Sequence, residues 1–210
     1  MKPLLPPEFQ TARSPPLSRR RPHMSAILEL PEVRRRVSPL TVEEYHRLDE
    51  LNEHGRRTEL IRGIVIEKMS KSPLHRIVAS LLYKLMLARL PEGHSVWKDE
   101  PLASEDSEPE PDISVTRGGD EDFSSAHPTT AELVVEVAVS SPALDRENAS
   151  LYAEAGVTEY WIVLATERRV EVYRRPENGC YQETRVFEFQ DTIECSGVPS
   201  LRIAVAELFS

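Results

Sequence analysis

The chain has 210 residues, of which 40% are hydrophobic and 29% are charged, a composition that is typical of a folded globular protein and excludes a wholly disordered chain. Its net charge of −9 is unevenly spread, because residues 1–36 carry +5 and the rest carries −14. An acidic body argues against broad, non-specific binding to a nucleic-acid backbone, since neutralising phosphates requires Lys and Arg. A local groove lined by basic residues is still compatible with the net negative charge of the body.

The first 36 residues, which begin "MKPLLPPEFQTARSPPLSRRRPHM", are rich in Pro, Ser and Arg and have no apolar periodicity. We expect a disordered tail over 1–36, with Met24 as an alternative translation start. No signal-peptide core follows the early basic residues, and no apolar run is long enough to span a membrane. We therefore predict a cytoplasmic protein with no membrane contact. Cys180 and Cys195 lack metal-binding spacing and are predicted to be free thiols.

The first half of the remaining chain predicts a helix, a hairpin and a second helix. An amphipathic helix follows a cap at Ser38 or Thr41 and stops at Gly55. Two β-rich pieces then flank Gly63, which indicates a hairpin. The segment "SPLHRIVASLLYKLMLARLPEG" has a wide apolar stripe and predicts a long core helix.

The second half predicts strands around one helix. "HSVWKDEPLAS" indicates a strand, and a proline-containing acidic loop leads to a second strand that starts at Asp112. "ELVVEVAV" is apolar enough to be covered on both faces, as in the middle of an α/β sheet. "DRENASLYAEAG" predicts a helix with Asp145 near its N-cap, followed by the buried strand "EYWIVLA" and two outer strands. A short helix is expected at the end of the chain.

Three carboxylates in predicted strands suggest metal chemistry. Asp112 begins a strand, Glu136 lies inside the most apolar one, and Glu59 lies in the hairpin. Such oxygen ligands suit Mg²⁺ or Mn²⁺, which activate water for phosphodiester hydrolysis. Each acid also has a structural interpretation: Glu59 could pair with Arg57 or Arg62, Asp112 could simply start its strand, and Glu136 could be neutralised by a buried Arg. No Gly-rich phosphate loop or GxSxG elbow supports another enzyme class.

Four segments in the same order, "TELIRGIVIEKMSKSPLH", "SEPEPDISV", "ELVVEVAVSS" and "DRENASLYAEAGVTEYWIV", resemble the Uma-two "putative restriction endonuclease" family of the PD-(D/E)XK nuclease superfamily. The resemblance implies one domain over 37–210 of class α/β, with a restriction-endonuclease-like core in which helices flank a mixed β-sheet. It implies Mg²⁺ or Mn²⁺ as the cofactor and DNA as the partner. On the family pattern, Glu59 corresponds to the first acid, Asp112 to the central metal ligand and Glu136 to the second acid.

The lysine of the superfamily signature is missing from its expected places. The generic position, two residues after Glu136, is Ala138, and the family's displaced position on the following helix is Asn148. An amide can position water by hydrogen bonding but cannot stabilise negative charge as a cation does. We therefore expect a weakened catalytic site that contains Asn148.

Four other residues could replace the lost charge. Arg146 lies two residues before Asn148 and can stabilise charge, although it does not give up its proton. Lys68 and Lys71 follow the hairpin and are expected to face solvent. His75 matches a position where the resembled family often has His, but a His at a helix start is more often structural.

These features predict a metal-dependent endonuclease that hydrolyses DNA phosphodiester bonds and is impaired by Asn148. The alternative is an inactive pseudo-nuclease that keeps the fold as a nucleic-acid or protein binding module. A homodimer is also expected, because related folds often pair.

Overall fold

The computed structural model describes residues 30–50, 55 and 57–210. The chain divides into two compact units, Met1–Ser38 and Pro39–Ser210. In the first, Pro31–Arg34 form the single helical turn α2, which starts at a proline whose fixed φ suits that position. The composition of this segment does not predict that turn, and residues 1–29 of the predicted tail lie outside the described residues. No helix within the described part of the chain is both long and apolar enough to cross a membrane.

The second unit holds the elements that the sequence predicts. Its helices are α3 (Val42–Asp49), α4 (Pro73–Arg89), α5 (Ala143–Glu154) and the 3₁₀ turns η1 (Asp120–Phe123) and η2 (Val205–Phe209). Its strands are β1 (Thr58–Ile61), β2 (Ile64–Glu67), β3 (His94–Trp97), β4 (Ile113–Arg117), β5 (Leu133–Ala138), β6 (Glu159–Leu164), β7 (Arg169–Glu177), β8 (Cys180–Phe187), β9 (Thr192–Glu194) and β10 (Arg202–Ala204). The predicted C-terminal helix is therefore a short 3₁₀ turn.

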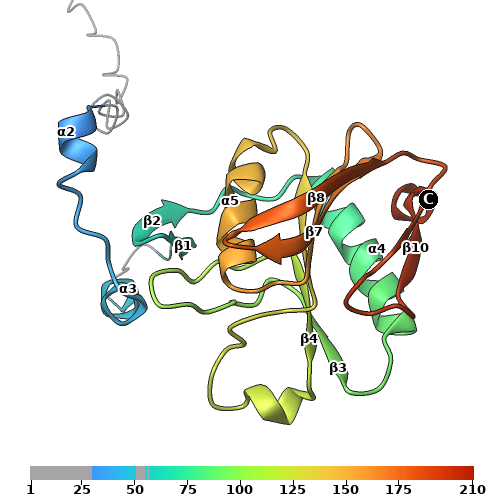
Figure 1. Cartoon of the computed structure of the whole chain (residues 1–210), viewed down its shortest axis with the longest axis horizontal. Helices are drawn as coiled ribbons and strands as arrows, with labels where there is room; N and C mark the ends of the chain where they lie inside the picture. The colour runs from blue at the N-terminus through green and yellow to red at the C-terminus, as the bar shows by residue number, and fades with distance from the viewer. Residues whose placement is uncertain (1–29, 51–54, 56) are drawn as a thin grey trace, which may run out of the picture. The chain divides into compact units, whose positions relative to one another are not determined.

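Six strands form the central sheet, in the order β3-β4-β5-β6-β7-β8 (Figure 1). Only β5 and β6 are parallel, and α5 connects them, as a crossover between parallel strands requires. All other neighbours are antiparallel. The sheet is therefore mixed, as predicted, and β5 and β6 lie at its centre where both faces are covered.

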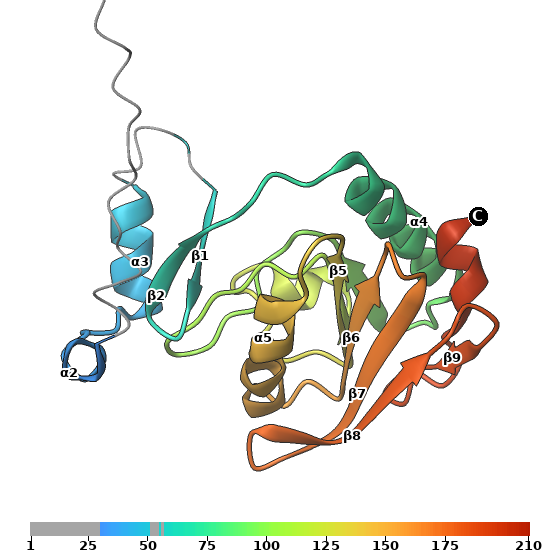
Figure 2. The ribbon, with the colours of Figure 1, turned by 90° about the horizontal axis from the view of Figure 1, so that it is seen from above.

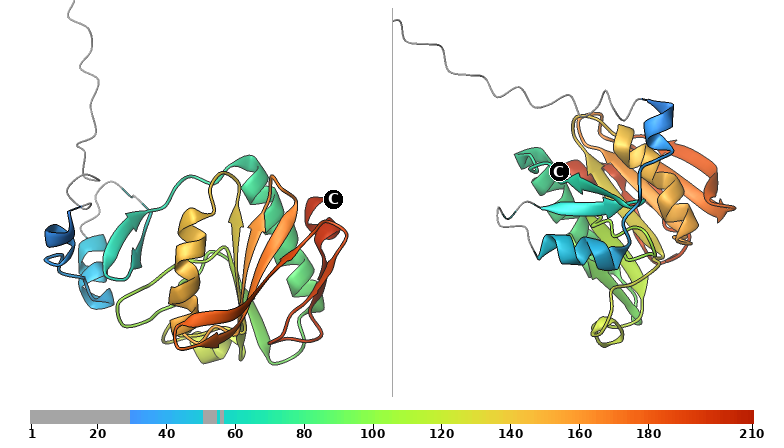
Figure 3. Two further views of the ribbon diagram at one scale, coloured as in Figure 1. Left: turned by 45° about the horizontal axis from the view of Figure 1, so that its top comes forward. Right: turned by 90° about the vertical axis from the view of Figure 1, so that its left-hand side faces the viewer.

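Helices α4 and α5 lie on opposite faces of the central sheet (Figures 2 and 3), and the side chains of β5 alternate between two cores. Val135 and Val137 pack with α4 and the C-terminal segment, whereas Val134 and Ala138 pack with Tyr152 of α5. This alternation follows from the twofold repeat of a strand. The residues that flank Glu136 in β5 are all apolar, because each face of this strand packs against a hydrophobic core.

The β1–β2 hairpin turns at Arg62 and Gly63, both of which have positive φ (50° and 72°). A Cβ at Gly63 would lie 2.3 Å from the Cβ of Pro39, so glycine is required there for space as well as for backbone conformation. After the hairpin, residues 68–72 form a linker to α4. The Ser72 hydroxyl caps α4 by accepting a hydrogen bond from the His75 backbone N–H.

Helix α3 begins at Thr41, which forms a capping box with Glu44. Of the two caps that the sequence allows, Ser38 and Thr41, the structure therefore selects Thr41. The two cysteines are free thiols, as predicted, with Cys195 buried and Cys180 exposed.

Candidate active site

The pairing of β4 with β5 brings two of the predicted site acids together. Ile113 pairs with Val135 in antiparallel register, so Asp112, one residue earlier, lies beside Glu136. The Asp112 backbone N–H donates to Oε2 of Glu136 at 3.3 Å, and the Val137 backbone N–H donates to Oδ2 of Asp112 at 2.8 Å. The two carboxylates are thus fixed by the sheet itself.

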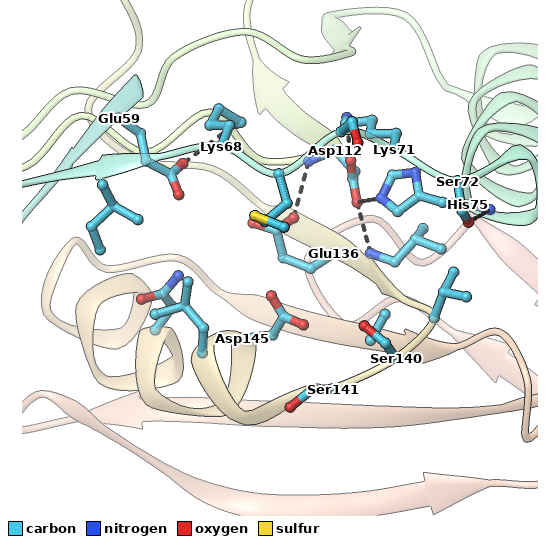
Figure 4. A pocket seen from close by; sticks show the side chains of 18 of the residues that line it. Glu59, Lys68, Lys71, Ser72, His75, Asp112, Glu136, Ser140, Ser141 and Asp145 are labelled. Carbon is cyan, nitrogen blue, oxygen red and sulfur yellow. Dashed lines mark hydrogen bonds and ion pairs between the residues drawn. The ribbon is translucent and has the colours of Figure 1, made fainter. Parts of the chain in front are cut away.

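These acids line a cavity of about 600 Å³ (Figure 4). Its walls come from β1, the linker between β2 and α4, the start of β4, the end of β5 and the first turns of α5. All four predicted site residues line it, namely Glu59, Asp112, Glu136 and Asn148. The other charged or titratable residues of the wall are Glu67, Lys68, Lys71, His75, Glu110 and Asp145. Segments far apart in the sequence therefore build one polar pocket.

Asp112 is the most heavily bonded acid of the pocket. It is 4% exposed, and its two oxygens contact different basic side chains: Nζ of Lys71 lies 2.5 Å from Oδ1, and Nε2 of His75 lies 2.9 Å from Oδ2. Burial raises the pKa of Asp112, but the His75 hydrogen bond and the Lys71 charge outweigh it and hold that pKa below its usual value. Asp112 is therefore an ionised carboxylate at neutral pH.

Glu136 differs, because none of the described residues forms an ion pair with it. Its Oε1 accepts a hydrogen bond from the Tyr152 hydroxyl at 3.0 Å, and its Oε2 accepts the Asp112 N–H. Burial, followed by the negative charges of Asp112, Asp145 and Glu59, raises the pKa of Glu136 well above its usual value. The pocket therefore lacks positive charge at this carboxylate.

Asp145 is a further acid of the pocket. As predicted, it lies near the N-cap of its helix, in the first turn of α5, although the N-cap itself is Pro142 and has no side-chain hydrogen bond. Its side chain lines the pocket and points toward the region of Glu136 (Figure 4). Burial, with the charges of Asp112 and Glu59, raises the pKa of Asp145 to about 6.

Glu59 lies at the end of the pocket that Lys68 occupies (Figure 4). Its Oε2 is 3.4 Å from Nζ of Lys68 and accepts the backbone N–H of Glu110 at 3.4 Å. Among the residues that the structure describes, no three His, Cys, Asp or Glu side chains are grouped closely enough to hold a metal ion. The assignment of Glu59 as a direct metal ligand therefore stays a prediction.

The expectation that Lys68 and Lys71 face solvent is wrong. Their side chains are 13% and 25% exposed, and both line the pocket. The reason is local, because Nζ of Lys68 donates to the Glu110 carbonyl at 2.7 Å, and Nζ of Lys71 bonds both Asp99 and Asp112. These acceptors hold both ammonium groups in the pocket wall.

Arg146 does not serve the pocket. Its guanidinium points to β7, where Nε donates to Oε2 of Glu171 at 3.0 Å, and its side chain is not part of the pocket wall. Asn148, by contrast, is 6% exposed and lines the pocket, and no hydrogen bond joins its amide to another described residue. Helix α5 therefore presents an acid and an amide to the pocket and no cation among the described residues.

The sequence indicates His75 and Lys71 as residues that could replace the missing lysine, but it does not predict their contacts with Asp112. A signal was present in "KSPLH", because Ser72 before a proline indicates a helix start and fixes the residues on both sides of it. The direction of each side chain depends on where the linker crosses β4 and β5. That crossing is a tertiary feature that local spacing does not encode.

Comparisons with known proteins agree with this architecture. The family described as "Putative restriction endonuclease", Uma2, matches residues 42–206. No curated protein matches the chain. A solved structure from Anabaena variabilis ATCC 29413, described as "a putative nuclease belonging to DUF820", superposes with a TM-score of 0.69 at 22% identity, covering 81% of this chain and 98% of the other. The likeness shows a shared nuclease-like fold, and the family match over most of the chain shows that this protein belongs to the Uma2 "putative restriction endonuclease" family.

Proposed function

We propose that this protein is an endonuclease that hydrolyses DNA phosphodiester bonds with the help of Mg²⁺ or Mn²⁺. The observation that carries the proposal is the pairing of Asp112 and Glu136 on adjacent strands at the wall of a polar pocket. Membership in the Uma2 family supports the reaction class and DNA as the substrate.

The donor set fits a hard divalent cation. Asp112 and Glu136 supply carboxylate oxygens. Burial, followed by the negative charges of neighbouring acids, raises the pKa of Glu136, and a bound cation would oppose that rise. Mg²⁺ keeps several waters and is commonly held by only one or two carboxylates, so a preformed cage of three acids is not needed. When bound, the ion would polarise a phosphoryl oxygen and lower the pKa of a water. Glu59, at the far end of the pocket, would act through water or after adjusting its side chain.

The chain's own residues then orient the reaction. His75 and the Val137 N–H hold Oδ2 of Asp112, and Tyr152 holds Oε1 of Glu136. These contacts fix both carboxylates before substrate arrives, so little reorganisation is needed in the transition state. In the reaction, a water oxygen bonds to phosphorus, the bond from phosphorus to one sugar oxygen breaks, and that oxygen takes up a proton.

Asn148 favours a second candidate function, a metal- or nucleic-acid-binding module that does not cleave. The amide lies in the pocket at the position where the resembled family has lysine, and α5 brings no other cation there within the described residues. Loss of one well-placed electrostatic donor typically costs about 10²–10³ in rate. Binding could therefore survive where cleavage does not.

One paired measurement separates the two functions. Calorimetric titration with Mn²⁺ and a plasmid-nicking assay are run on the parent, on Glu136→Gln, and on Glu147→Gln as a control at an exposed acid of α5 outside the pocket. The nuclease proposal expects the parent and the control to bind Mn²⁺ and nick DNA, and Glu136→Gln to lose both. Mn²⁺ binding without nicking in the parent would favour the binding module. A parent that neither binds Mn²⁺ nor nicks would overturn the proposal.

A further inference from the structure

Among the described residues that line the pocket, all the basic side chains come from one side. Lys68, Lys71 and His75 all belong to the linker between β2 and α4 or to the first turn of α4. The opposite wall, at α5, contributes Asp145 and Asn148. A cation that serves the central acids must therefore come from the linker.

Of the two linker lysines, Lys71 is placed at the central acids. Its Nζ lies 2.5 Å from Oδ1 of Asp112, whereas Nζ of Lys68 bonds the Glu110 carbonyl and lies 3.4 Å from Glu59. Lys71 directly precedes Ser72, whose hydroxyl caps α4, so its backbone is held where the helix begins. Figure 4 shows Lys71 and His75 side by side at Asp112.

We propose that Lys71 supplies, from the β2–α4 linker, the positive charge toward the scissile phosphate that the resembled family places on the helix corresponding to α5 and that Asn148 cannot provide. The inference rests on the proposed nuclease function and assigns a further catalytic residue to it. Lys71 is a flexible side chain with three N–H donors, so it can pass from Asp112 to a phosphate oxygen while staying within the same pocket. Its role is electrostatic, and it neither gains nor loses a proton during hydrolysis.

A competing explanation makes Lys71 only a structural partner of Asp99 and Asp112. The two explanations differ in what loss of the charge does to metal binding. A structural partner holds the Asp112 carboxylate in place, so its removal would weaken Mn²⁺ binding together with cleavage. A cation that acts on substrate instead repels Mn²⁺ at short range, so its removal would leave Mn²⁺ binding unchanged or strengthen it, by roughly tenfold for charges several Å apart at a partly screened site.

The test uses the full chain and the substitution Lys71→Met, which keeps the length of the side chain and removes its charge. The control is Lys84→Met on α4, since Lys84 is exposed and lies outside the pocket wall. A double variant, Lys71→Met with Asn148→Lys, returns a lysine to the family position. Plasmid nicking, Mn²⁺ calorimetry and Tm are measured for each protein.

We expect Lys71→Met to lose nicking activity by about 10²–10³ while Mn²⁺ affinity is equal to or higher than in the parent, and Lys84→Met to match the parent. The double variant should recover most of the nicking activity with an unchanged Tm. Undiminished nicking by Lys71→Met, or joint loss of nicking and Mn²⁺ binding, would overturn the role of Lys71. A folded double variant that stays as inactive as Lys71→Met would also overturn it. Failure of the proposed function itself looks different, because the parent would then not nick DNA, whether or not it binds Mn²⁺.

Discussion

Two glutamates in the neighbouring central strands β5 and β6 have different surroundings in this protein. Glu159 at the start of β6 is fully buried, and Nε of Arg174 lies 3.0 Å from its Oε2. Its carboxylate accepts hydrogen bonds from Nη2 of Arg174 at 3.1 Å, the Trp161 indole N–H at 2.6 Å and the Ser196 backbone N–H at 2.7 Å. Glu136 in the middle of β5 receives a tyrosine hydroxyl and one backbone N–H, and its near neighbours in the pocket are other acids. The charge of Glu159 is balanced by Arg174, whereas none of the described residues forms an ion pair with Glu136.

The comparison shows which property distinguishes a candidate functional carboxylate in an apolar strand from a structural one. Burial alone does not, since Glu159 is the more buried of the two and serves the structure. The distinguishing property is the lack of an ion-pair partner among the described residues. An uncompensated charge in a partly buried site lowers the stability of the fold unless a bound ligand compensates it. Four predictions test this comparison, from the largest expected effect to the smallest.

Arg174→Met should be the most destabilising of these changes. It would leave Glu159 buried without a counter-charge, and breaking a buried pair by removing one partner typically costs about 3–5 kcal/mol. Urea denaturation at pH 7 measures the effect. The matched control is Arg202→Met, which removes an ion pair whose two side chains are both 63% exposed and should cost about 1 kcal/mol or less. Equal losses in the two variants would show that Glu159 is not held by Arg174.

Asp145→Asn should change how stability depends on pH. The pKa of Asp145 is raised from 3.8 to about 6 in the folded protein, so its contribution to stability is fully present below about 3.8 and is lost as pH rises through about 6. The variant removes this loss and should be more stable than the parent by about 2–3 kcal/mol at pH 7, with little difference at pH 4. Thermal unfolding across that range measures it. If the stability difference between the variant and the parent were the same at all pH values, ionisation of Asp145 would not be its cause.

Much of this architecture follows from local patterns in the sequence. The buried strands β5 and β6, the long helix α4 and the hairpin turn at Gly63 follow from apolar runs and turn chemistry, and the closeness of Asp112 and Glu136 follows once β4 and β5 are paired. The place of Asp145 in the pocket wall could not be predicted, because an acid in the first turn of a helix is equally well explained by its position near the cap.

Local sequence patterns do not predict which acidic side chains the Arg and Lys residues contact. A buried Arg was considered as the partner of Glu136, but Arg146 points instead to Glu171, and the buried Arg pair belongs to Glu159. Lys71 was expected in solvent, because a lysine in a polar linker gives no local sign of burial. Its placement depends on Asp99 and Asp112, which are 28 and 41 residues further along the chain. Long-range pairing of this kind is set by the fold as a whole.

Glu136→Gln should have the opposite sign from the same substitution at Glu159. At Glu136 the amide removes one of several repelling charges. Its oxygen can accept the Asp112 N–H, and its NH2 group can donate to the Tyr152 hydroxyl, so the metal-free protein should gain on the order of 1 kcal/mol at pH 7. Glu159→Gln should destabilise, because it leaves Arg174 without its counter-charge. Both are measured by urea denaturation in EDTA. Destabilisation by both substitutions would remove the contrast between the two glutamates.

Tyr152→Phe should give the smallest effect and the most specific one. The Tyr152 hydroxyl donates to Oε1 of Glu136, and its loss should weaken Mn²⁺ binding by about 2- to 10-fold, which corresponds to a net hydrogen-bond contribution of about 0.5–1.5 kcal/mol. The matched control is Tyr181→Phe in the same aromatic cluster, whose hydroxyl donates to the Val157 carbonyl at 2.9 Å. Both variants lose one hydrogen bond and should lose similar Tm, but only Tyr152→Phe should change Mn²⁺ affinity in calorimetry. Equal Mn²⁺ affinities in the two variants would mean that Glu136 is positioned by the sheet alone, through the Asp112 N–H, and that the tyrosine beside it serves packing.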